Sequence, residues 1–220
     1  YVGQISRWCE RYGYRLTGHI LEEKSLDRQI LSCGDILSVY SLMQNPGMDW
    51  LGREIGPSTT AVQVASVAHQ TGKKQVLSET FALCGWDVSF EELKQIYEWQ
   101  MVRGINLLCQ HLEGYSLRGI RKRDYPATLF YQQPWWSEYR KLNDVFSRLG
   151  MLLSEGKVKF ETLVVHPMSS AWICFNNKDN GLLRELDEKF MQTIHSLEEN
   201  QIQYDLGDER IMQLHGGSLR

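Results

Sequence analysis

Short apolar runs and longer segments of helical periodicity alternate along most of this chain, and this alternation constrains the fold more than any other feature. Four strand-like runs begin about 25 to 35 residues apart, the period of a repeated βα unit. Parallel strands need a crossover connection, usually a helix, between them. The sequence therefore predicts an α/β fold around a parallel sheet. The expected strands are residues 15–21, 39–49, 75–80 and 105–110.

Helical patterns fill the spaces between these strands. The most specific start signal is at Ser89, because Glu92 follows three positions later, as in a capping box. Gly72 follows the preceding helical pattern as a candidate C-cap. A long loop over residues 112–133 precedes the last helix of this part. Helices are therefore expected at residues 60–71, 89–103 and 134–154.

The pattern changes at Gly156, where a new βα unit begins. A short apolar run over residues 161–167 is typical of a buried strand, and residues 182–199 carry apolar side chains at helical spacing. A further short strand is expected at residues 201–206. This order of elements predicts the beginning of a doubly wound α/β domain.

Two domains follow from this change. We expect the first at residues 1–155 and the start of the second at residues 156–220. The chain opens without a methionine, in what reads as the end of a helix over residues 3–11. We therefore expect a fragment of a longer polypeptide.

Charge and cysteine usage argue against several classes of function. The chain carries 24 Lys and Arg against 27 Asp and Glu, and its formal net charge of −3 gives no basic field for nucleic acid. No apolar run approaches the roughly 20 residues of a membrane-spanning helix. The five cysteines are scattered without a C-x-x-C pair, which favours a reducing compartment. We expect a cytoplasmic protein that binds neither nucleic acid nor a membrane.

Motifs for cofactors and metals are missing from the sequence. The isolated glycines match neither G-x-G-x-x-G nor G-x-x-x-x-G-K-[ST], so we expect no nucleotide cofactor. Neither G-x-S-x-G nor H-E-x-x-H occurs, and no metal site is expected. The basic residues at 118–123 lie among aromatic ones that could stack nucleic-acid bases, but the charge balance of the whole chain disfavours that interpretation.

Carboxylates at the strand ends are the first candidates for chemistry, because ligands of parallel α/β proteins bind beyond the carboxyl ends of the strands. Glu79 follows the apolar body of the third expected strand and is the leading candidate for a catalytic carboxylate. Glu22, which with Glu23 follows the first strand, is the second candidate. Each carboxylate could instead cap a helix or form a structural ion pair.

Polar and aromatic residues near the strand ends and in the long loop form the expected binding surface. Polar side chains would hydrogen-bond sugar hydroxyls, and flat rings would lie against apolar sugar faces. A structural role explains each histidine equally well when it is taken alone, and several of the aromatic residues would simply anchor the loop. The candidate substrate-binding residues are His19, Asn45, Asp49, Trp50, Trp86, His111, Tyr115 and Trp135.

Three stretches combine into a more specific pattern. Residues 76–86 contain S-E-x-F-x-x-x-G-W, residues 99–111 contain Q-x-x-R-G-x-N, and Pro-Trp-Trp follows at 134–136. Together they resemble large bacterial glycoside hydrolases of the α-L-rhamnosidase-like type, and the similarity covers about residues 14–172. Downstream, the end of the strand at His166-Pro167 and the later acidic residues resemble the flavodoxin-like domain that follows the barrel in related enzymes.

The resemblance implies the C-terminal half of a (β/α)8 (TIM) barrel, followed by the start of that second domain. The four strands would be the fifth to eighth of the barrel, and the first four would precede Tyr1. Glycosidases use two carboxylates that flank the scissile bond. Glu79 matches the one near the seventh strand, so its partner would lie in the missing N-terminal half, with Glu22 as an internal substitute. The expected substrate is a glycan or a small glycoside, and the fragment alone is expected to be inactive.

Two other interpretations stay open. The chain could be a non-catalytic carbohydrate-binding or interaction module whose aromatic loop holds sugar. It could also belong to a metal-assisted sugar isomerase or aldolase barrel in which Glu79, His111 and Asp49 ligate a divalent ion.

Overall fold

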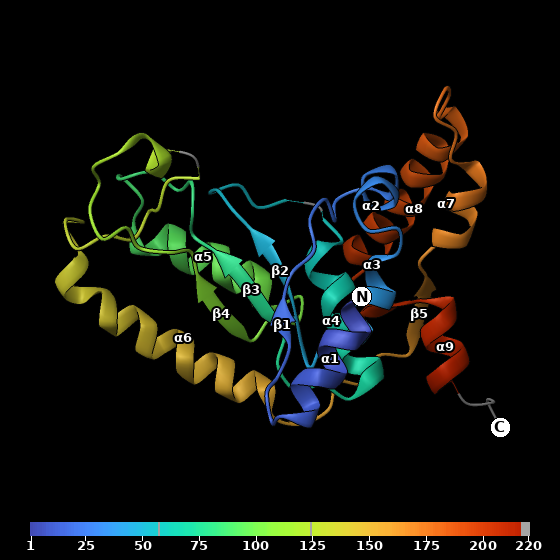
Figure 1. The fold of residues 1–220 in the computed structure, drawn as a ribbon, viewed down its shortest axis with the longest axis horizontal. Helices are drawn as coiled ribbons and strands as arrows, with labels where there is room; N and C mark the ends of the chain where they lie inside the picture. Colours follow the sequence, from blue (N-terminus) through green and yellow to red (C-terminus); the bar gives the residue numbers. More distant parts are fainter. Residues whose placement is uncertain (57, 124, 217–220) are drawn as a thin grey trace.

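Two parallel sheets organise the protein in the computed structural model, which describes residues 1–56, 58–123 and 125–216. All neighbouring strands pair in parallel, so the predicted α/β class is confirmed. The larger sheet curls through four strands that follow chain order (Figure 1). These strands are β1 (Thr17–Gly18), β2 (Asn45–Trp50), β3 (Leu77–Thr80) and β4 (Leu107–Gln110). The smaller sheet pairs β5 (Thr162–Val165) with β6 (Tyr204–Gly207).

Helices connect the strands and cover the outer side of the curled sheet (Figure 1). Short 3₁₀ turns lie at Ile120–Arg123 and Trp136–Glu138. None of the helices in the described residues is long and apolar enough to cross a membrane. The helices are α1 (Val2–Arg11), α2 (Leu26–Ser32), α3 (Ile36–Ser41), α4 (Thr60–Thr71), α5 (Phe90–Met101), α6 (Tyr139–Ser154), α7 (Met168–Cys174), α8 (Gly181–Glu199) and α9 (Glu209–His215).

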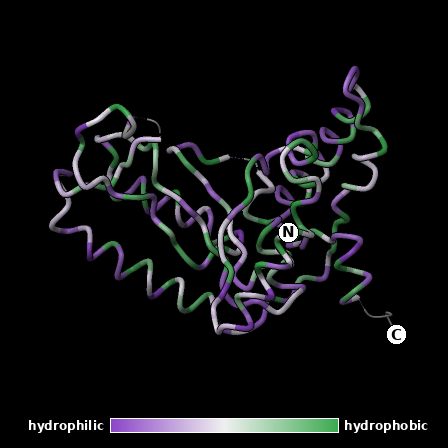
Figure 2. The backbone as a smooth tube through the Cα atoms, viewed as in Figure 1, coloured by the Kyte–Doolittle hydropathy of each residue, from purple (hydrophilic) through white to green (hydrophobic). Residues whose placement is uncertain are grey.

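The local signals read from the sequence set the boundaries of two helices as expected. The Ser89 hydroxyl accepts from the Glu92 backbone N–H at 3.2 Å, and the Glu92 carboxylate accepts from the Ser89 N–H at 2.8 Å. Gly72 ends α4 in the left-handed conformation, with φ of 69°, which a glycine adopts without steric cost. Hydrophobic and hydrophilic residues alternate along α6 at helical spacing (Figure 2), and its apolar stripe packs inward.

The expected strand at 39–49 is wrong in its first half. Residues 36–41 form α3, because the Asp35 side chain caps it by accepting from the Ser38 N–H at 3.2 Å, and because Ile36, Leu37 and Tyr40 fit one buried helical face. The strand begins only at Asn45. The first strand, expected at residues 15–21, is also shorter, because β1 covers only Thr17–Gly18.

Helix α4 lies between the two sheets and joins them through one apolar core. Its residues from Thr60 to Ala68 are all buried. The Ser66 hydroxyl accepts from the Leu206 N–H at 2.8 Å, and the Gln70 amide donates to the Leu206 carbonyl at 2.8 Å. Buried residues of α8, β6 and α9 therefore belong to the same apolar core as the part of the chain before residue 156. The division into domains at 156 stays a prediction.

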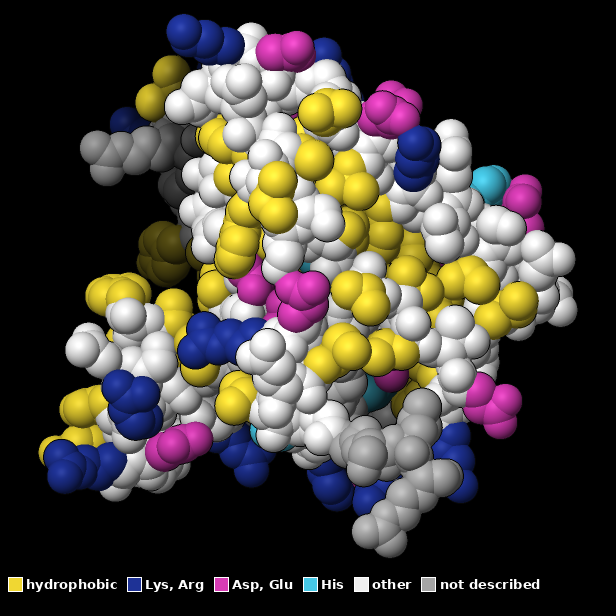
Figure 3. Space-filling model, turned by 90° about the vertical axis from the view of Figure 1, so that its right-hand side faces the viewer, with side chains coloured by type: hydrophobic (Ala, Val, Ile, Leu, Met, Phe, Trp, Pro, Cys, Tyr) yellow, Lys and Arg dark blue, Asp and Glu magenta, His cyan; other side chains and the backbone are white. Residues whose placement is uncertain are grey.

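In the described residues, the smaller sheet exposes apolar side chains, and the larger sheet has strand edges without a pairing strand. Leu163 and Val165 of β5 are nearly half exposed, and apolar side chains gather on the side of the molecule that α7, α8 and α9 form (Figure 3). Among the described residues, β1 of the larger sheet pairs only with β2, and β4 only with β3. A groove of about 610 Å³ runs between the free side of β4 and α6.

Candidate functional site

Glu79 lies near the carboxyl end of β3 between two histidines. In the strand register it is flanked by Asp49 of β2 and Cys109 of β4. One carboxylate oxygen, Oε2, lies 3.0 Å from His19 Nε2, and the other, Oε1, lies 3.8 Å from His111 Nε2. The side chain is 29% exposed, so the carboxylate is open to a ligand while held on both sides.

His19 has an acceptor on both of its ring nitrogens. Nδ1 lies 3.2 Å from the Ile20 carbonyl oxygen, and Nε2 lies against the Glu79 carboxylate. Asp49 adds a second carboxylate, 4.0 Å from Nδ1. Burial by itself lowers the pKa of His19, but the Ile20 carbonyl, Asp49 and Glu79 raise it above its ordinary value. The geometry thus favours an imidazolium that forms an ion pair with Glu79.

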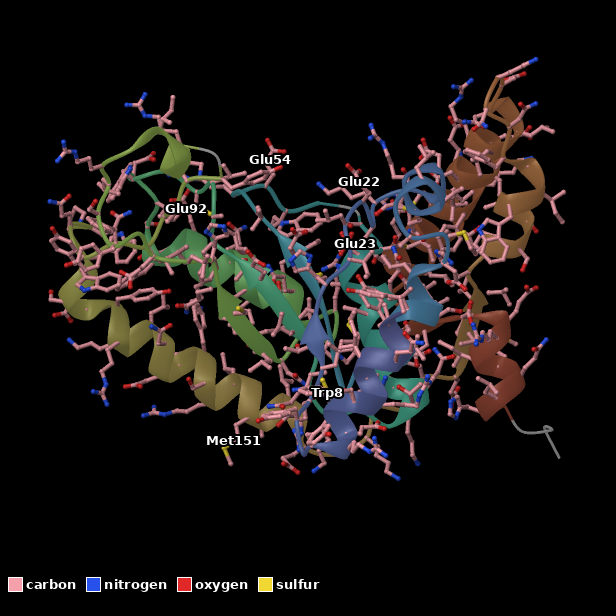
Figure 4. All side chains as sticks on the ribbon, viewed as in Figure 1. Trp8, Glu22, Glu23, Glu54, Glu92 and Met151 are labelled. Atoms are coloured by element: carbon pink, nitrogen blue, oxygen red, sulfur yellow. The ribbon has the colours of Figure 1, made fainter. Side chains whose placement is uncertain are left out.

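Glu23 is the functional candidate that sequence reasoning passed over. Its side chain is almost completely buried, and its Oε1 accepts from the Tyr40 hydroxyl at 3.1 Å. Burial, and then the nearby Asp49, raise the pKa of Glu23 to about 7. Glu22 instead lies on the outside of the same loop (Figure 4), where it is 53% exposed and pairs with Arg28 at 3.8 Å. The structure does not bring Glu22 to Glu79.

One group in the described residues has the spacing of a metal site. His19, Glu23 and Asp49 each offer a ligand atom within 4.8 Å of the others. Nitrogen and oxygen donors of this kind could hold a divalent ion. This set differs from the alternative set of Glu79, His111 and Asp49, because the loop after β1 supplies two of its members.

Two predicted binding residues lie away from Glu79. Asn45 is the first residue of β2, at the opposite end from Asp49, and its amide donates to Gln75 Oε1 at 3.0 Å. The expectation that Asn45 ends a strand is wrong, because α3 takes the place of the first half of that strand. Trp50 follows Asp49 directly in β2, so its side chain points to the opposite face of the sheet. There it packs against Trp99 of α5, with ring centroids 4.6 Å apart.

The aromatic candidates occupy different environments. Trp86 is half exposed and lies edge-on to the buried Phe130 ring, with centroids 6.1 Å apart. Tyr115 is fully exposed. Trp135 donates its indole N–H to the Val88 carbonyl at 2.9 Å and packs among other rings, so it anchors the start of α6. Trp86 and Tyr115 have the exposure that a sugar-stacking ring needs.

Arg53 joins the loops beyond β2 and β3 into one rim. Its guanidinium donates to the Cys84 carbonyl and the Asp87 carboxylate, and it lies 3.2 Å from the Glu92 carboxylate. The Cys84 N–H donates to the Thr128 hydroxyl at 2.9 Å, which ties in the loop beyond β4. Three loops therefore share one framework at the carboxyl end of the sheet.

The arrangement of sheet and site defines a class of protein. Alternating parallel β/α units build a curled half-barrel, with titratable side chains gathered at the carboxyl ends of the strands, as in part of a (β/α)8 barrel. No family model matches the sequence, and no curated protein matches it.

A solved structure shows the same fold. The rhamnosidase from Novosphingobium sp. PP1Y aligns with 74% of this chain at a TM-score of 0.58 and 18% sequence identity. The chain spans only 16% of the length of that rhamnosidase. The likeness shows the half-barrel fold, and it makes this chain structurally similar to part of a glycoside hydrolase.

Proposed function

We propose that the chain is the C-terminal half of the (β/α)8 barrel of a glycoside hydrolase, and that Glu79 is one of the two carboxylates that act on the glycosidic bond. The observation that carries this proposal is the Glu79 carboxylate held between His19 and His111 at the carboxyl ends of the half-barrel strands. The likeness to part of a rhamnosidase supports it.

The ion pair with His19 suits Glu79 for one of the two roles. A glycosidase needs a protonated carboxyl that donates to the leaving group and an ionised carboxylate that serves as nucleophile or base. His19 on one side and His111 on the other fix the orientation of the Glu79 carboxylate, as an attacking or proton-accepting group requires. We assign Glu79 the role of nucleophile or base. The proton donor would then come from the other half of the barrel.

The neighbouring groups suit sugar binding. Asp49 and His111 would hydrogen-bond hydroxyls of the sugar ring, and Trp86 or Tyr115 would stack against the part of the substrate beyond it. The substrate class is a glycan or small glycoside, and the proposed compartment is the cytoplasm.

The decisive experiment uses a polypeptide that supplies both halves of the barrel. We expect it to hydrolyse one member of a panel of aryl glycosides that includes 4-nitrophenyl α-L-rhamnoside. Glu79→Gln keeps the shape and removes the charge, so kcat should fall by roughly three or more powers of ten while the thermal transition changes little. Glu91→Gln, on the exposed start of α5, is the matched control. A Glu79→Gln enzyme with normal kcat would overturn the assignment.

A metal-assisted sugar isomerase or aldolase is the second candidate, favoured by the spacing of His19, Glu23 and Asp49. It predicts activity that EDTA abolishes and a divalent ion restores. Sugar binding without any turnover would favour the third possibility, a carbohydrate-binding module.

A further inference from the structure

A buried carboxyl group lies directly behind the pair formed by His19 and Glu79. We propose that Glu23 is a positioning residue of this site, which holds His19 and Asp49 in place and through them fixes the Glu79 carboxylate. This inference rests on the proposed function, because it assigns Glu23 a part in the same site.

Three helices hold Glu23 on its buried side. The Glu23 carbonyl oxygen accepts from the Gln29 amide of α2 at 2.7 Å and from the Gln63 amide of α4 at 3.0 Å. The side chain accepts from the Tyr40 hydroxyl of α3 at 3.1 Å. With 4% of its surface exposed, the residue has little freedom to take another position.

The other side of Glu23 faces the site. A ligand atom of Glu23 lies within 4.8 Å of both His19 and Asp49. Since His19 lies 3.0 Å from Glu79, an unbroken series of close groups runs from Tyr40 through Glu23 and His19 to Glu79. It crosses from α3 through the loop after β1 to β3, so a shift of Glu23 would reach the candidate catalytic carboxylate.

A purely structural role makes a different prediction from a positioning role. The Gln29 and Gln63 amides bind the backbone of Glu23, so they do not require a carboxyl group at this position. Burying a carboxyl group is costly compared with burying an amide or an apolar group. The presence of a carboxyl group at this position is explained if it acts on the charged groups in front of it.

Two substitutions separate these roles. Glu23→Gln keeps the size of the side chain and an oxygen that can accept from Tyr40, but it removes the carboxyl group that faces His19 and Asp49. Tyr40→Phe keeps the carboxyl group and removes its anchor. Glu22→Gln makes the same chemical change one residue away, on an exposed side chain.

The first measurement reads His19 directly. In protein with labelled histidines, containing both halves of the barrel, we expect Glu23→Gln and Tyr40→Phe to move the His19 ring NMR signals at neutral pH. Glu22→Gln should leave those signals in place, and the exposed His195 ring should not respond to any of the three substitutions. Unchanged His19 signals in Glu23→Gln would overturn the inference.

The second measurement separates positioning from folding. A displacement of about 1 Å can cost about a hundredfold in rate, so we expect Glu23→Gln to lower kcat by about ten- to a hundredfold with little change in KM. Tyr97→Phe removes the hydroxyl of another buried tyrosine and is the control for the Tyr40→Phe variant. A Glu23→Gln enzyme that is less stable but has normal kcat would show a structural role only. If no glycoside is hydrolysed, the proposed function fails, and the His19 signals still decide the role of Glu23.

Discussion

Single residues of this protein depart from their ordinary chemistry where burial removes water from a titratable group. His166 follows β5 and is 2% exposed, and neither ring nitrogen has a partner among the described residues. Its ring lies edge-on to Phe190, with centroids 5.5 Å apart. Burial lowers the pKa of His166 to about 4, from an ordinary value of 6.5, although the nearby Asp208 opposes the shift. The neutral ring is thus part of the folded state.

The unfolded chain binds a proton at His166 at higher pH than the folded chain does. The contribution of this group to stability is complete above about pH 6.5, and it is lost as the pH falls toward about 4. The full difference is of the order of 3 kcal/mol. We predict that His166→Leu narrows the gap between urea midpoints at pH 7 and pH 4.5, whereas His195→Leu, on exposed α8, does not. An unchanged gap in His166→Leu would contradict this reading.

The positions of polar residues at the ends of the expected strands predict much of the site but not all of it. His19, Asp49, Glu79 and His111 were expected near one another, and the structure brings them together because parallel strands end at one edge of the sheet. Nothing in the sequence distinguishes Glu23 from its neighbour. Which one turns inward depends on the path of the loop and on hydroxyl and amide groups from helices distant in sequence.

At the scale of helices and strands, two elements can approach closely where one of them carries a glycine. In the sequence, the only sign of such a contact is the small residue itself. Gly150 lies on the buried stripe of α6, where the helix touches the chain that leads into β4. A Cβ added at this glycine would lie 2.4 Å from the Asn106 carbonyl oxygen. Because that oxygen belongs to the backbone, neither element can give way without a shift of its main chain.

Gly150→Ala should therefore destabilise the protein by about 1 to 3 kcal/mol. Met151→Ala changes the next residue on the same helix, where the side chain is 73% exposed, and should alter stability by less than about 0.5 kcal/mol. Urea denaturation of the two variants gives the comparison. Equal midpoints would mean that α6 can move away from β4 at little cost.

Elements with a local start signal were predictable, and elements set by tertiary packing were not. The capping box at Ser89 placed α5, and the apolar stripe placed α8, since both signals lie within the helix itself. Residues 39–43 look like a strand by composition, yet the cap at Asp35 and the buried face that includes Tyr40 make α3 the better solution. Local propensity gave way to the packing of a whole face.

The larger sheet ends on two strands that each pair on one side only within the described residues. In the described residues, the outer sides of β1 and β4 have no strand beside them. Open edges of parallel strands bind further strands, and a complete barrel removes them by closure.

The isolated 220-residue chain is therefore expected to associate, either as dimers through these edges or as larger aggregates. Sedimentation velocity over a range of concentrations measures this directly. The control is a polypeptide in which the other barrel strands are present, and it should sediment without edge-driven association. A 220-residue monomer with a single cooperative thermal transition would require the half-barrel proposal to be withdrawn.

Helix α4 belongs to both sheets at once, and this limits how such a protein can change by recombination. A gene segment for the part of the chain after residue 155 cannot be exchanged as an independent cassette, because its removal would expose the side of α4 that Asp205 and Leu206 contact. A replacement segment would need a surface complementary to that side of α4. We expect the two parts to be inherited as a linked pair, with α4 tolerating fewer substitutions than the other helices around the half-barrel.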